Sequence, residues 1–203
     1  MSACEYFDPA QRKVLAGEAA TVRAVRDRLS DYTVLHFSCH GFAGFNRPLA
    51  GGLVMAHDER LTLRDILSLW LENARLAVLS ACETGVPGLD LPDEVISLPS
   101  GLAQAGIPGV VASLWSVSDL STMMLVAHFY ALWKGEGQRP AEALRHAQKW
   151  VRDTTNGEKA AFMSEKLPIH VADALYKASM LARPEENDFA HPFHWAAFTY
   201  TGV

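Results

Sequence analysis

Hydrophobic and polar positions follow two patterns along this chain, one typical of buried strands and one typical of amphipathic helices. Continuous runs of apolar and β-branched residues at 33–39, 75–80 and 108–114 predict strands, and the last two are apolar enough to be covered on both faces. A short run at 53–55 predicts a minor strand, and 195–200 predicts a strand near the end of the chain.

Between these strands, apolar residues recur at helical spacing. Thr62 with Asp65 has the pattern of a capping box, and either Ser118 or Asp119 can cap a long helix. Pro99 should kink or split its helix at Ser97-Leu98. Helices are predicted over 18–30, 62–71, 93–105, 119–134 and 140–153.

The alternation of strands and helices predicts an α/β fold, with a mostly parallel sheet and helices on both of its faces. Residues 154–190 lack this regularity and are interpreted as an insertion in a single domain that spans 1–203. Ligands of such sheets collect at the carboxyl ends of the strands, where the loops diverge.

Composition excludes several classes of function. The 203 residues are 49% hydrophobic, which is typical of a globular domain, and 23 acidic against 18 basic residues give a net charge of −5 without long single-sign runs. A nucleic-acid surface is therefore not expected. The chain has neither a membrane-spanning apolar stretch nor a signal-peptide pattern, which predicts a cytoplasmic protein without membrane contact. Its three cysteines are expected to be free thiols.

Two reactive residues stand at predicted strand ends: His40 after the strand 33–39, and Cys82 after the strand 75–80. If the two strands are neighbours, their ends lie about 4.8 Å apart, so an imidazole and a thiol could approach each other. A base beside a thiol generates the thiolate, which is the nucleophilic form. This pairing therefore predicts nucleophilic catalysis.

The remaining cysteines and the second histidine have simpler interpretations. Cys4 and Cys39 are expected to act as small hydrophobic residues, and His36 as a core histidine with its hydrogen bonds satisfied. A metal site built from Cys39, His40 and Cys82 is the disfavoured alternative, because adjacent strand residues point to opposite faces and the spacing of a metal motif is missing.

The reactive residues belong to motifs that resemble those of CHAT domains, which are relatives of caspases and separases. The resemblance extends over about 15–203, and the motifs occur in the family's order: HFSCHG at 36–41, LSACETG at 79–85, VASLWSVSD at 111–119 and HPFHWAAF at 191–198. It implies a caspase-haemoglobinase-like fold. The family's additional upstream strand and helix have no counterpart before Glu18, so the chain is expected to lack them.

The same resemblance implies a cysteine endopeptidase with a His40/Cys82 dyad that works through a thioester acyl-enzyme and needs no cofactor. Backbone N–H groups of Gly41 and Cys82 would stabilise the oxyanion. The implied partners are a protein or peptide substrate and a regulatory repeat domain of the tetratricopeptide type. Two other functions stay open: an inactive CHAT-like module that acts through protein contacts, and a small-molecule acyl hydrolase or transferase.

By the same resemblance, the first specificity pocket involves Ser80 and the segment from Ser113 to Asp119, which includes Trp115. Asp119 either caps its helix or holds a basic P1 side chain, and Asp93 with Glu94 either complement a helix dipole or contact substrate. The negative charge expected at this edge of the sheet predicts a basic or neutral P1 residue and disfavours aspartate.

Overall fold

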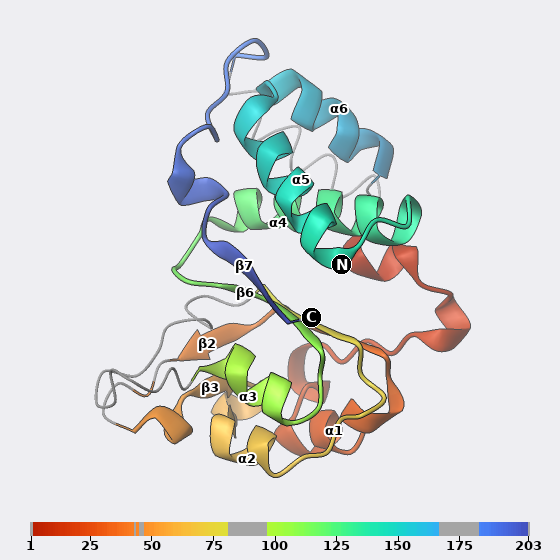
Figure 1. Ribbon diagram of the computed structural model, residues 1–203, viewed down its shortest axis with the longest axis vertical. Helices are drawn as coiled ribbons and strands as arrows, with labels where there is room; N and C mark the ends of the chain where they lie inside the picture. Colours follow the sequence, from red (N-terminus) through yellow and green to blue (C-terminus); the bar gives the residue numbers. More distant parts are fainter. Residues whose placement is uncertain (1, 43, 45–46, 81–96, 167–182, 203) are drawn as a thin grey trace. The chain divides into compact units, whose positions relative to one another are not determined.

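The computed structural model describes residues 2–42, 44, 47–80, 97–166 and 183–202 (Figure 1). The chain divides into two compact units. Unit 1 comprises Met1–Lys13 and Val117–Ala197, and unit 2 comprises Val14–Ser116 and Phe198–Val203. Each unit therefore contains segments that are far apart in the sequence. Among the described helices, none has both the length and the apolar character that crossing a membrane requires.

Unit 2 is built around a four-stranded sheet in the order β1-β5-β6-β7. Its strands are β1 (Val34–Phe37), β5 (Leu76–Leu79), β6 (Gly109–Ser113) and β7 (Phe198–Gly202). The first three are parallel to one another, and β7 runs antiparallel to β6. The predicted α/β fold with a mostly parallel sheet is confirmed, and β5 and β6 are buried along their whole length, as their apolar sequences predict.

Three short helices pack on this sheet to form the core of unit 2: α1 (Val22–Arg26), α2 (Leu63–Leu67) and α3 (Leu98–Gln104). The capping box of Thr62 with Asp65 is present, although α1 and α2 are shorter than predicted. α3 begins directly after Ser97, so Pro99 falls in its first turn, where a missing N–H costs no helical hydrogen bond.

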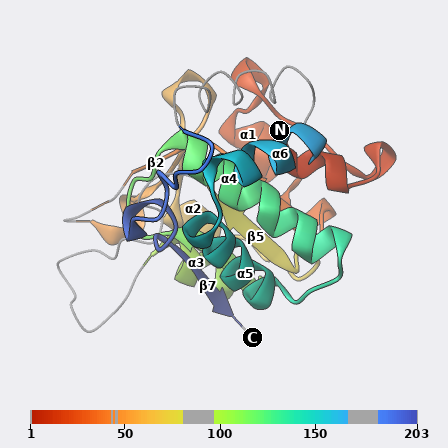
Figure 2. The ribbon, with the colours of Figure 1, turned by 90° about the horizontal axis from the view of Figure 1, so that it is seen from above.

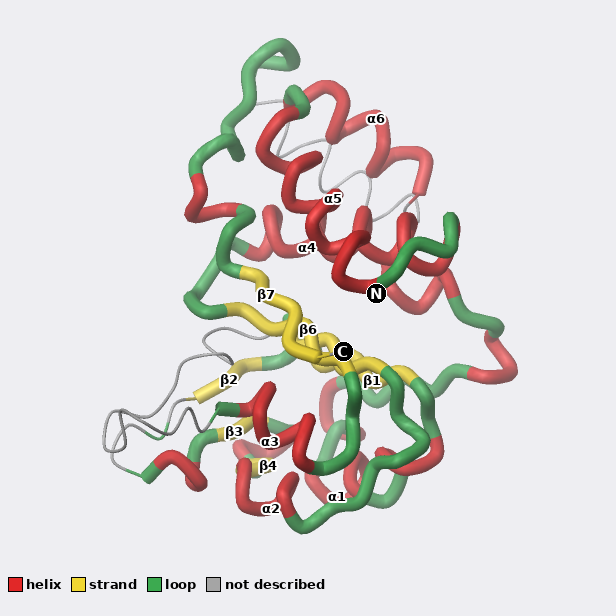
Figure 3. Tube along the Cα trace, viewed as in Figure 1, coloured by secondary structure: helices red, strands yellow, loops and turns green. Residues whose placement is uncertain are grey.

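A second sheet in unit 2 consists of β2 (His40–Phe42), β3 (Gly52–Val54) and β4 (Arg60–Thr62), all antiparallel (Figure 3). Leu53 and Leu61 lie on its inner face and are completely buried in the core. The apolar run at 53–55 predicted β3. The partner strands were not predicted, because His40–Phe42 and Arg60–Thr62 lack the continuous apolar run that predicted β3.

Unit 1 is helical, with α4 (Asp119–Tyr130), a π-helical continuation (Ala131–Gly135), α5 (Pro140–Asp153) and α6 (Asn156–Lys166). α4 and α5 lie side by side in both views (Figures 1 and 2), and both were predicted. α6 was not, because its sequence is polar and only weakly amphipathic. Single 3₁₀ turns lie at Ser2–Tyr6, Pro9–Gln11, Gly17–Ala19, Leu29–Asp31, Pro48–Ala50, Ala56–Asp58 and Pro192–His194.

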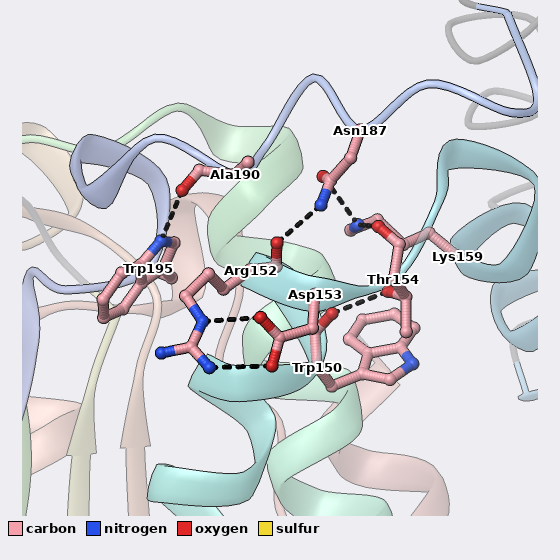
Figure 4. Close-up of polar contacts among 8 residues, drawn as sticks. All are labelled: Trp150, Arg152, Asp153, Thr154, Lys159, Asn187, Ala190 and Trp195. Carbon is pink, nitrogen blue, oxygen red and sulfur yellow. Dashed lines mark hydrogen bonds and ion pairs between the residues drawn. The ribbon is translucent and has the colours of Figure 1, made fainter.

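Lys159 of α6 holds the segment that follows Arg183 against the helices of unit 1 (Figure 4). Its side chain is almost completely buried, and its ammonium group donates hydrogen bonds to the Thr154 carbonyl and to Asn187 Oδ1. The Asn187 amide in turn donates to the carbonyl of Arg152. Burial lowers the pKa of Lys159 to about 8.

Trp195 explains why the last strand begins later than predicted. Its indole Nε1 donates to the Ala190 carbonyl at 3.0 Å (Figure 4). Its own carbonyl accepts from Gln148 Nε2 at 3.0 Å. These bonds hold Trp195 in unit 1, so only residues from Phe198 onward pair with β6.

Candidate active site

The carboxyl ends of β1 and β5 lie next to each other at one edge of the main sheet. The two strands pair in parallel register, with Phe37 opposite Leu79. Beyond this last pair, the Ser80 amide donates to the Phe37 carbonyl at 2.9 Å. The segments that lead to His40 and to Cys82 therefore leave neighbouring strands at the same edge, as predicted. Cys82 itself lies outside the described residues.

Side chains also join these two strand ends. The Ser80 hydroxyl lies within hydrogen-bond distance of the Phe37 carbonyl oxygen, at 3.2 Å, and of His36 Nε2, at 3.0 Å. Burial lowers the pKa of His36 to about 4, so the imidazole is neutral at pH 7. His36 is thus a hydrogen-bonded histidine, as predicted, and it ties β1 to β5.

His40 occupies a different element from the predicted one. β1 ends at Phe37, and His40 is the first residue of β2, opposite Val54 of β3. The physical reason is a change of pairing partner: β1 pairs with β5, whereas β2 belongs to the small antiparallel sheet. The His40 side chain is exposed, and Gly41, the predicted oxyanion donor, pairs with Leu53.

Cys39 precedes His40 but is not suited to nucleophilic attack. It is partly buried and packs against the core of unit 2. This burial raises the pKa of its thiol to about 11, which keeps the sulfur protonated at neutral pH. The prediction that Cys39 acts as a small hydrophobic residue is confirmed.

The predicted pocket residues fall in both units. Ser113 is buried at the end of β6, and Trp115, which follows it in unit 2, is partly buried. Asp119 is an exposed first-turn residue of α4 in unit 1, and Ser118 is the N-cap, since its Oγ accepts from the Ser121 amide at 3.3 Å. Asp93 and Glu94 lie outside the described residues, and their predicted roles stay predictions.

Metal-ligating side chains do not gather in the part of the chain that the structure describes, where His, Cys, Asp and Glu form no group of three or more. His36 and Ser80 illustrate what the sequence could not reveal. His36 could be assigned to a buried strand from its apolar neighbours, but its bond to Ser80 depends on the register between two strands whose pairing no local pattern specifies.

Comparison with protein families decides the affiliation of this chain. A family model described as the CHAT domain matches residues 3–203. The chain belongs to the CHAT domain family. CHAT domains are caspase-like and peptidase-related, which agrees with the mixed α/β architecture of unit 2. Among curated proteins, none matches this CHAT domain.

Proposed function

We propose that this CHAT domain is a cysteine endopeptidase in which Cys82 is the nucleophile and His40 the general base. The observation that supports the proposal is the hydrogen-bonded parallel pairing of β1 with β5 up to Phe37 and Ser80, because the strands that precede the two residues in the sequence end side by side at one edge of the sheet. Membership of a peptidase-related family supports the same chemistry.

In the proposed mechanism, the Cys82 sulfur attacks the scissile carbonyl of a protein or peptide, and His40 takes the thiol proton. The tetrahedral intermediate collapses as His40 transfers that proton to the amine, which leaves with the C-terminal product. A thioester remains on Cys82. Water, activated by His40, then hydrolyses the thioester and restores the thiol. Backbone N–H groups of Gly41 and Cys82 would stabilise the oxyanion, each by about 3 kcal/mol.

Covalent labelling tests the nucleophile. A peptidyl acyloxymethyl ketone should give one adduct on Cys82, located by mass spectrometry, in the wild type and in Cys39→Ala. Cys82→Ala should fold normally but show neither labelling nor peptide cleavage. Labelling of Cys39 in the wild type, or equal loss of cleavage in both variants, would contradict the assignment. A folded protein that is not labelled would favour the inactive interaction module.

Turnover of a defined peptide tests the base. His40→Ala should reduce kcat by a factor of about 10² or more. The matched variant His36→Ala should act through stability instead, because its hydrogen bond to Ser80 joins two strands. Nearly full turnover in His40→Ala would rule out the dyad. Hydrolysis of small acyl esters without any peptide cleavage would favour the acyl hydrolase alternative.

A further inference from the structure

One face of the small sheet carries His40 together with an arginine. His40, Val54 and Arg60 are opposite one another in the register of β2, β3 and β4, so their side chains share a face. The other face carries Leu53 and Leu61, which are buried in the core. The face with His40 and Arg60 is therefore the outer one, and both of these residues are exposed.

Arg60 is held over an aromatic ring on this face. Its guanidinium carbon lies 4.8 Å from the ring centroid of Phe42, which is two residues after His40 in β2. In the register, Phe42 pairs with Gly52 and Arg60 pairs with Val54, so the contact runs diagonally across β3. A guanidinium stacked on an aromatic face keeps its N–H edges free for bidentate binding of a carboxylate.

The guanidinium of Arg60 is not paired with an acidic side chain of the residues that the structure describes. Among the residues that the structure describes, Arg60 forms no ion pair. Glu59, its neighbour in sequence, is engaged elsewhere, since Oε2 accepts from the Val22 amide of α1 at 2.7 Å. Arg60 is therefore a cation that is held by a ring without being neutralised by a described acidic side chain.

The separation between Arg60 and His40 matches a short stretch of peptide. Adjacent strands are about 4.8 Å apart, so the Cα atoms of His40 and Arg60, two strands apart, are about 10 Å from each other. An extended peptide advances about 3.4 Å per residue. A carboxylate held by Arg60 would then belong to a residue two or three positions from the bond that reacts at His40.

We infer that Arg60, held by Phe42, selects substrates with an aspartate or glutamate two or three residues from the scissile bond. This inference rests on the proposed peptidase function and adds a substrate class to it. The acidic residue occupies a different position of the substrate from the basic or neutral P1 residue that the sequence predicts. The preferred peptide therefore carries a basic or neutral P1 residue and an acidic residue two or three positions from the scissile bond.

The local contact with Arg60 decides the preference at this position despite the net charge of −5. At physiological ionic strength, charges more than about 8 Å apart are largely screened from each other, so most of the chain's acidic residues contribute little. A guanidinium in direct contact with a carboxylate gains both a charge interaction and two hydrogen bonds. An exposed pair of this kind corresponds to a preference of about fivefold.

The test uses matched peptides that differ only in Glu, Gln or Lys at one position, scanned over three residues on either side of the scissile bond. The wild type should prefer Glu to Gln in kcat/KM by about fivefold at one of these positions. Arg60→Gln should abolish the preference, and Arg60→Glu should shift it toward Lys. Arg64→Gln, which removes an exposed charge from α2 instead, is the control and should keep the wild-type preference.

Binding of the same peptides to Cys82→Ala, followed by fluorescence anisotropy, separates this inference from the proposed function. Arg60→Gln in that background should weaken binding of the Glu peptide about fivefold and leave the Gln peptide unchanged. Cleavage without a Glu preference, or a preference that survives Arg60→Gln, would overturn the role of Arg60 and leave the peptidase standing. A different result would overturn the peptidase function alone: the wild type is never labelled at Cys82, yet binding still prefers the Glu peptide and this preference depends on Arg60.

Discussion

At the scale of single residues, burial keeps two titratable groups near the candidate dyad in their neutral forms. The pKa of His36 is lowered to about 4 and that of Cys39 is raised to about 11, both mainly by desolvation. His40 is exposed on β2. The environment thus distinguishes two histidines that are only four residues apart, since His36 is bonded to Ser80 between two strands and His40 lies on an exposed face.

The pKa of His36 predicts a specific loss of stability in acid. Between pH 6.5 and about 4 the unfolded chain binds more protons at this residue than the folded chain, so the free energy of unfolding falls as pH falls. The two pKa values set a ceiling of about 3 kcal/mol on this effect. His36→Gln keeps a side-chain amide that can bond to Ser80 but does not titrate, so it should lose less stability than the wild type as the pH falls.

Urea unfolding at pH 7.0 and pH 4.5 measures this difference. His40→Gln is the matched control, because it replaces an exposed histidine and leaves His36 in place, so it should keep the wild-type loss. If His36→Gln and the wild type lost the same stability between these two pH values, the burial of His36 would not be the source of the loss.

At the scale of elements, the small antiparallel sheet depends on close backbone contact at Gly52. A Cβ atom at this position would lie 2.1 Å from the Leu61 carbonyl oxygen of β4, so the backbone of one strand would have to move. Gly52→Ala should therefore destabilise unit 2 by about 2 kcal/mol. The small sheet, and with it the placement of His40, should be the part most disturbed.

Thermal and urea unfolding would measure the effect of Gly52→Ala. Gly135→Ala is a suitable control, since its added Cβ would approach only Tyr6, at 3.8 Å, and alanine favours helical conformation. The close contact between β3 and β4 would be disproved by a Gly52→Ala protein with wild-type stability.

The elements also show what sequence reasoning can and cannot provide. Strands β5 and β6 were predicted from continuous apolar runs, and helices α4 and α5 from the residues that begin them, Ser118 or Asp119 and Pro140. β2 and β4 have three residues each, and their pairing with β3 is a nonlocal property. For the candidate site, the motif containing His40 could be recognised. The proximity of His40 to Phe42 and Arg60 could not, since it follows from register across three strands.

At the scale of the whole molecule, the two units should respond to opposite ends of the pH range. His36 belongs to unit 2 and Lys159 to unit 1. Because the pKa of Lys159 is lowered from 10.5 to about 8, the unfolded chain binds more protons between these values, and unit 1 gains stability as pH rises through this interval. The ceiling is again about 3 kcal/mol.

Lys159→Met should remove this gain while filling most of the same volume. Above pH 9 the raised pKa of Cys39 lowers the stability of the folded state, which opposes the gain from Lys159. Both proteins contain Cys39, so the wild type is compared with Lys159→Met at each pH. The stability of the wild type relative to Lys159→Met should increase from pH 8 to 9.5. Lys149→Met, which replaces an exposed lysine of α5, should show no such change relative to the wild type.

The long segment between β6 and its partner β7 has a consequence for biosynthesis. β6 leaves the ribosome before the long segment Val117–Ala197, and its pairing partner β7 follows only after that segment. At a translation rate of about 5–20 residues per second, one edge of β6 stays unpaired for on the order of ten seconds. During this interval unit 1 can complete its helices, whereas unit 2 still lacks a strand. A translational pause or premature termination before Phe198 would therefore expose β6 to nonnative pairing with other chains.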